Sequence, residues 1–175
     1  MKALSRDQVL AVLKAAKQAS ERDYCAILLS YRHALRASEV CSLNTRNFSD
    51  GYITIQRLKG SLKTVQPLFD SEEPLLDERK EITRYLATIP KGQRLFPITR
   101  QHYHRLFRAY CLQVGIPAHL AHPHSAKHAI AMELVSKVAI NELQRFLGHR
   151  SLNSTGMYLR VDDEKACAAV AGVMK

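Results

Sequence analysis

The segment RDYCAILLSYRHAL, residues 22–35, is apolar on nearly every side when it is wound into a helix. A helix of this kind is stable in water only when other elements cover it from several directions. We therefore predict a globular fold in which this segment is the central helix and other helices pack around it.

Apolar residues at helical spacing recur along most of the chain. Ser5 is predicted to cap the first helix, and Ser38 a short helix that follows the central one. A period of two, which indicates strands, appears only around Gly60, in residues 50–68, and predicts a small hairpin. The predicted fold class is therefore mainly α with a small antiparallel β-sheet. Besides the central helix and the short one, helices are expected at residues 6–18, 72–89, 100–114, 124–135, 139–147 and 162–174.

The length of 175 residues suits one compact domain with a single core, so we expect one domain over residues 1–175. The amino terminus lacks the continuous apolar centre of a signal peptide, and no run reaches transmembrane length. We therefore expect a soluble, cytoplasmic protein with no membrane partner. Neither a disulfide framework nor a zinc ribbon is expected, because no CxxC pair is present and the cysteines lie scattered in apolar contexts, at Cys25, Cys41, Cys111 and Cys167.

The chain is strongly basic, with a net charge of +10 and a pI near 9.7. An excess of this size suits a polyanionic partner, most simply nucleic acid. A membrane surface and plain solubility are the alternative explanations of the charge.

The stretch HPHSAKHAIAMEL, residues 122–134, places His124, Lys127 and His128 at the start of a predicted helix. Two histidines four residues apart share a helical face, which a zinc site can use. The HExxH signature is incomplete, however, and Lys127 would repel a metal. Imidazole and ammonium groups are good donors to phosphate oxygens, so an anion site is the better hypothesis.

Four short patterns resemble those of the tyrosine recombinases, a family that includes phage integrases and the short recombinases that invert fimbrial promoters. The family's GLRxSE, HxLRH and LGHxxxxxTxxY boxes are similar to ALRASE, HSAKH and LGHRSLNSTGMY in this chain. A turn lysine, Lys59, stands eight residues before Pro67, as in the family. These patterns occur in the family order and span residues 36–158.

The resemblance implies a tyrosine recombinase catalytic domain that cleaves DNA without a cofactor or metal. Tyr158 would be the nucleophile and would form a 3′-phosphotyrosine. The nonbridging oxygens would be held by Arg36, His124, Lys127 and His149, and Lys59 would protonate the leaving 5′-oxygen. Glu39 would orient Arg36, and His128 would brace the site through hydrogen bonds. The implied partners are double-stranded DNA and further copies of the chain, in a tetramer on that DNA.

Each of these residues also has an ordinary interpretation when it is taken alone. Arg36 could be a surface arginine and Lys59 a solvated turn lysine. His149 could be a helix C-terminal histidine favoured by the helix dipole, with Gly148 as the residue that stops the helix, and Tyr158 could simply pack its ring. Because the patterns occur in the same order as in the family, we favour the interpretation of these residues as an active site.

The chain departs from the family at Lys127, where the pattern has arginine. Lysine lacks the planar fork that binds two phosphate oxygens. The alternatives to a recombinase are therefore a DNA-binding regulator that has lost activity, and a type IB topoisomerase-like enzyme with the same chemistry.

Three further questions stay open at the level of sequence. The helix expected at 162–174 could cover its own core or be exchanged with a neighbouring subunit. The amino-terminal DNA-clamping domain of longer integrases is expected to be absent. The chain would then be either a domain fragment or a naturally short recombinase. The DNA site, the direction of recombination and any accessory proteins are not encoded in these patterns.

Overall fold

The computed structural model describes residues 3–57, 62–151, 153–156 and 158. These residues form a mainly helical fold with one small antiparallel sheet, which confirms the predicted class. In chain order the elements are α1 (Arg6–Ala19), α2 (Glu21–Arg32), α3 (Ala37–Ser42), a 3-10 turn η1 (Thr45–Asn47), β1 (Phe48–Ser49), β2 (Tyr52–Ile55), β3 (Thr64–Pro67), α4 (Glu78–Leu86), α5 (Arg100–Gln113), α6 (Pro123–Leu134), α7 (Ile140–Leu147) and α8 (Asn153–Gly156).

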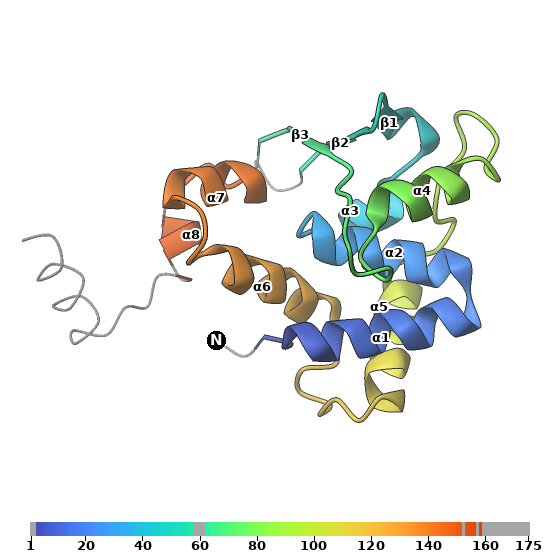
Figure 1. The fold of residues 1–175 in the computed structure, drawn as a ribbon, viewed down its shortest axis with the longest axis horizontal. Helices are drawn as coiled ribbons and strands as arrows, with labels where there is room; N and C mark the ends of the chain where they lie inside the picture. The colour runs from blue at the N-terminus through green and yellow to red at the C-terminus, as the bar shows by residue number, and fades with distance from the viewer. Residues whose placement is uncertain (1–2, 58–61, 152, 157, 159–175) are drawn as a thin grey trace, which may run out of the picture.

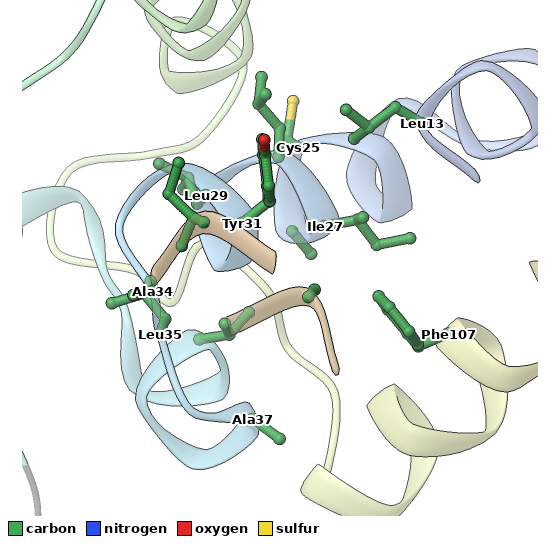
Figure 2. Close-up of a cluster of buried hydrophobic side chains, with 14 of the residues drawn as sticks. Leu13, Cys25, Ile27, Leu29, Tyr31, Ala34, Leu35, Ala37 and Phe107 are labelled. Atoms are coloured by element: carbon green, nitrogen blue, oxygen red, sulfur yellow. The ribbon is translucent and has the colours of Figure 1, made fainter. Parts of the chain in front are cut away.

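Helix α2 is the centre of the fold, as its apolar surface predicts. It is buried over most of its length and packs against α1, α3, α4 and α6 (Figure 1). Figure 2 shows Leu13 of α1, Phe107 of α5 and the α2 residues Ile27 and Leu29 in one buried cluster. The helix therefore fixes the relative positions of the elements that carry the site.

The two predicted serine caps have different outcomes. Ser5 caps α1 in a reciprocal box, because its hydroxyl accepts from the Gln8 N–H at 3.2 Å and the Gln8 side chain accepts from the Ser5 N–H at 3.0 Å. The prediction for Ser38 is wrong. Helix α3 begins at Ala37, two residues earlier than a cap at Ser38 would place it, and its N-cap is Arg36, whose N–H donates to the Glu39 carboxylate at 2.8 Å. A charged acceptor inside the first turn thus replaces the capping hydroxyl.

Helix α4 is shorter than the predicted segment 72–89. It begins at Glu78 because the Asp77 side chain accepts from the Lys80 N–H at 3.2 Å and so caps the helix there. The bounds of α5, α6 and α7 agree with their predictions to within one residue. The helix expected at 162–174 lies outside the described residues.

The predicted hairpin forms from β2 and β3, which pair antiparallel from Tyr52 with Pro67 to Ile55 with Thr64. A third strand, β1, pairs Phe48 with Ile53 and was not predicted, since two residues are too few to show a period. Ile53 is buried on the core side of the sheet. Strand β3 also contacts α7, so the hairpin joins the carboxy-terminal helices to the rest of the fold (Figure 1).

Two sequence expectations concern the environment of the chain. Cys25, Cys41 and Cys111 are buried free thiols, as their apolar contexts predict, and Cys167 lies outside the described residues. Among the helices that the structure describes, none combines the length and the apolar character that crossing a membrane requires.

Candidate active site

The predicted site residues come together from four separate segments. Arg36 and Glu39 stand at the start of α3, three residues stand on α6, His149 follows α7, and Tyr158 follows α8. Direct contacts join Arg36 to Glu39, His124 to His128 and His128 to Tyr158. Lys127 and His149 are close enough to Arg36 for its charge to lower their pKa values. Lys59 lies outside the described residues, so the structure assembles the following seven predicted positions: Arg36, Glu39, His124, Lys127, His128, His149 and Tyr158.

Arg36 is held by the buried carboxylate of Glu39. Its Nη1 donates to Glu39 Oε1 at 2.9 Å, and its backbone N–H donates to Oε2 at 2.8 Å. Burial alone would raise the pKa of Glu39, but the Arg36 N–H and the charge of Arg57 outweigh this effect and hold that pKa below its ordinary value. Glu39 is therefore ionised and fixes the direction of the Arg36 guanidinium.

The turn before Arg36 is strained at Ala34, which has a φ of 51° although it is not glycine. The left-handed conformation costs an alanine about 1 kcal/mol. Two backbone hydrogen bonds hold this turn, from the Ala34 N–H to Tyr31 O at 3.2 Å and from the Leu35 N–H to Ser30 O at 2.9 Å. The chain thus turns sharply from α2 and presents Arg36 beside α6.

Lys127 is a buried amine inside the site. Its side chain is 2% exposed, and its Nζ has no hydrogen-bond partner among the described residues. Burial, together with the charges of Arg36 and Arg57, lowers the pKa of Lys127 to about 7 against the opposing effect of Glu39. A buried cation without a partner is costly, so an anion that reaches Nζ would relieve this cost.

His149 is held through one ring nitrogen by a buried hydroxyl. Its Nδ1 lies 3.0 Å from Thr155 Oγ1. Burial, together with the charges of Lys127 and Arg36, lowers the pKa of His149 to about 4, so the ring is neutral at pH 7. With Nδ1 engaged, the opposite nitrogen, Nε2, is the one that can meet a phosphate oxygen.

The Tyr158 hydroxyl lies 2.9 Å from His128 Nδ1, and both residues are buried. Burial raises the pKa of Tyr158 to about 12, although Arg36 acts in the opposite direction. Burial and the neighbouring His124 lower the pKa of His128 to about 4. The His128 ring is therefore neutral at pH 7, and its Nδ1 can accept a hydrogen bond from the phenol.

His124 stands at the mouth of the site. Its ring meets the His128 ring edge-on at a centroid distance of 4.2 Å. It also lines a hollow of about 270 Å³ together with Arg36, Arg100 and His104. Within the described part of the chain, no three His, Cys, Asp or Glu side chains are grouped as a metal site.

Two residues of the site were not singled out from the sequence. Thr155 had a signal, because it is the threonine of the LGHxxxxxTxxY box. Arg57 had none, since an arginine in a hairpin is usually solvated. In the structure Arg57 is 2% exposed and its Nη1 donates to Glu39 Oε2 at 3.2 Å.

Comparison with known proteins shows which sequences and structures this chain is similar to. Residues 2–165 match the Phage integrase family. The type 1 fimbriae regulatory protein FimE of Escherichia coli (strain K12) is 36% identical over 149 residues, which cover 78% of this chain and 73% of that protein. The tyrosine recombinase XerA of Thermococcus kodakarensis is 29% identical over 170 residues, which cover 93% of this chain and 59% of that protein.

Solved structures show the same fold. A crystal structure of XerA recombinase superposes with a TM-score of 0.76 at 20% identity, over all of this chain and 64% of that one. A lambda integrase dimer bound to a COC′ core site gives a TM-score of 0.73 at 20% identity, over 93% of this chain and 48% of that one. This chain thus spans roughly half to two thirds of these solved chains. It belongs to the phage integrase family and has the fold of a tyrosine recombinase catalytic domain.

Proposed function

We propose that this chain is a site-specific DNA recombinase that cleaves and rejoins DNA through a 3′-phosphotyrosine at Tyr158. The observation that carries the proposal is the position of the Tyr158 hydroxyl. It contacts a neutral imidazole, and its ring lies within the field of Arg36, in the same site as the unpartnered Lys127. A nucleophile, a proton acceptor and cationic groups for a phosphate are thus assembled together.

In the cleavage step, Tyr158 Oη forms a bond to the scissile phosphorus while the bond from phosphorus to the 5′-oxygen breaks. His128 is positioned to accept the phenolic proton, given its 2.9 Å contact with the hydroxyl. We assign the protonation of the leaving 5′-oxygen to Lys59. The phosphodiester energy is retained in the phosphotyrosine, so a 5′-hydroxyl from another strand can reverse the step without ATP.

Positive charge around the phosphate would stabilise the transition state. Arg36, Lys127 and His149 would face the nonbridging oxygens, with His124 at the entrance. Glu39 would keep Arg36 in place through its two contacts, at 2.8 and 2.9 Å. The relatives whose structures are solved on DNA include a lambda integrase dimer and tetramer. By extension, this chain would assemble on double-stranded DNA as a homo-oligomer, namely a tetramer. It would act on DNA in the cytoplasm.

A trapping experiment tests the proposal. A pool of duplexes with randomised sequence, each nicked near the centre, is incubated with the protein. Cleavage beside the nick releases a short fragment that carries the new 5′-hydroxyl. Once this fragment has diffused away, the phosphotyrosine cannot be rejoined. We expect a covalent protein–DNA adduct that survives denaturation, with a common sequence among the trapped duplexes. Binding without any adduct would favour a DNA-binding regulator instead.

Binding itself should depend strongly on salt. The net charge of +10 implies that phosphate contacts supply much of the affinity. Each neutralised phosphate releases condensed counterions, so affinity for nonspecific duplex should fall by roughly tenfold or more between 50 and 200 mM salt. Fluorescence anisotropy with a labelled duplex measures this dependence. An affinity that does not change with salt would mean that the basic surface serves another purpose.

A further inference from the structure

Arg57 lies at the base of the hairpin, two residues after the end of β2, and all the donors of its side chain are engaged inside the protein. A guanidinium has five N–H groups. Nε donates to Thr64 Oγ1 at 3.3 Å, and Nη1 and Nη2 together donate four more bonds, to Glu39 Oε2 and to three backbone carbonyls. With its side chain buried and its donors used, Arg57 has none left for a DNA phosphate.

On one side, Arg57 holds the segment that presents Arg36. Its Nη1 donates to Ala34 O at 3.3 Å and its Nη2 to His33 O at 2.9 Å, so it bonds both carbonyls at the strained turn. It also shares the Glu39 carboxylate with Arg36, at 3.2 Å from Oε2. Two independent connections thus join Arg57 to the position of Arg36.

On the other side, Arg57 holds the segment that presents His149. Its Nη2 donates to Phe146 O at 3.1 Å, near the end of α7. The next contact is with Gly148, where a Cβ would lie only 2.8 Å from Arg57 Cγ, and the φ of +68° also favours glycine there. Gly148 thus lets the backbone just before His149 pack against the Arg57 side chain.

The charge of Arg57 also acts on the site. It helps to lower the pKa of Glu39, and it adds to the effects of burial and Arg36 that lower the pKa of Lys127 and His149. Replacing Arg57 would therefore change the titration of residues that it does not contact directly.

We propose that Arg57 is a positioning residue for phosphoryl transfer, which fixes Arg36 and His149 relative to each other and does not touch the DNA. This inference rests on the proposed function and deepens it. Arg57 acts through other residues and is not itself a catalytic residue.

The substitution Arg57→Lys separates geometry from charge. Lysine keeps the positive charge, but its three donors cannot serve five acceptors. We expect the adduct-forming rate constant at saturating DNA to fall on the order of 10- to 100-fold, since small displacements of reacting groups have effects of this size. DNA affinity should stay near that of the wild type, because Arg57 is not exposed to the duplex.

The matched control is Arg94→Lys. Arg94 Nη2 donates to the backbone carbonyl of Cys41 at 2.5 Å and has no described contact with the site residues. The same chemical change there should leave the rate within about twofold of the wild type. Circular dichroism melts of both variants give the folded fraction at the assay temperature, by which each rate is corrected.

A second variant, Arg57→Met, tests the electrostatic part. Removing this cation should raise the pKa of Lys127 and His149, so the limbs of the pH–rate profile that they control should move to higher pH. A residue that only stabilises the fold would lower the active fraction without moving the profile. If Arg57→Met does not fold, the corrected rate of Arg57→Lys decides the question.

Either of two results would overturn the positioning role of Arg57 and leave the proposed function intact. One is a wild-type adduct together with a corrected Arg57→Lys rate within about twofold of the wild type, the range of a neutral substitution. The other is a folded Arg57→Met protein with an unshifted pH profile. If the wild type forms no adduct with any duplex in the pool, the proposed function fails and this inference fails with it.

Discussion

Tyr158→Phe is expected to remove covalent attachment to DNA completely, while folding and DNA affinity stay close to those of the wild type. The phenylalanine ring keeps the buried packing and loses only the hydroxyl that contacts His128 Nδ1 at 2.9 Å. One hydrogen bond of this kind contributes only about 1 kcal/mol to stability. Trapping on the nicked duplex pool, followed by denaturing electrophoresis, measures the adduct, and anisotropy measures the affinity.

Tyr110→Phe is the matched control for this experiment. Tyr110 also has a hydroxyl with one side-chain partner, since it donates to Asp23 Oδ2 at 2.9 Å, but it lies on α5 and has no hydrogen bond to the site residues that the structure describes. Its loss should leave adduct formation unchanged. An adduct formed by Tyr158→Phe, and lost in Tyr110→Phe, would identify Tyr110 as the nucleophile and overturn the assignment to Tyr158.

The helices of this fold could be predicted because their burial follows a local period. The central segment 22–35 and the stripe on α1 each bury the residues that their spacing indicates. The errors arose where a few side-chain bonds decide the outcome. Helix α3 starts at Ala37 because Glu39 caps the Arg36 N–H, and β1 forms because a neighbouring strand is present. Neither the start of α3 nor strand β1 produces a periodic pattern of apolar residues in the sequence.

The site could be predicted only through the order of its motifs. Arg36, Lys127 and Tyr158 lie on segments that tertiary packing alone brings together, and no local property links them. Arg57 was missed for the same reason, because one of its partners, Phe146, is 89 residues away in the chain. A hairpin arginine is buried only when such distant acceptors surround it.

The family pattern has arginine where this chain has Lys127, and the effect of this difference should depend on pH because Lys127 is buried. With a pKa of about 7 in the DNA-free protein, Lys127 is charged below pH 7 and becomes neutral as the pH rises through that value. An arginine at this position stays charged throughout the range. The two side chains should therefore differ least at pH 6 and most at pH 8.5.

Lys127→Arg is accordingly expected to raise the rate of adduct formation, by about tenfold if roughly 1.4 kcal/mol of transition-state stabilisation is gained. The planar fork can bind two phosphate oxygens, which the single amine cannot, and it also keeps its charge in alkaline solution. The measurement is the second-order rate constant at limiting DNA from pH 6 to pH 8.5, because this constant reports the ionisation of the free protein.

Lys137→Arg, an exposed position beyond the end of α6, is the control for a general effect of the same exchange. Its rate should match that of the wild type at every pH. A folded Lys127→Arg protein that cleaves no faster at any pH would mean that the pocket has adapted to lysine, for example by lacking room for the larger group. A gain that does not change with pH would assign the whole benefit to the fork, and would show that Lys127 is already charged in the wild-type site.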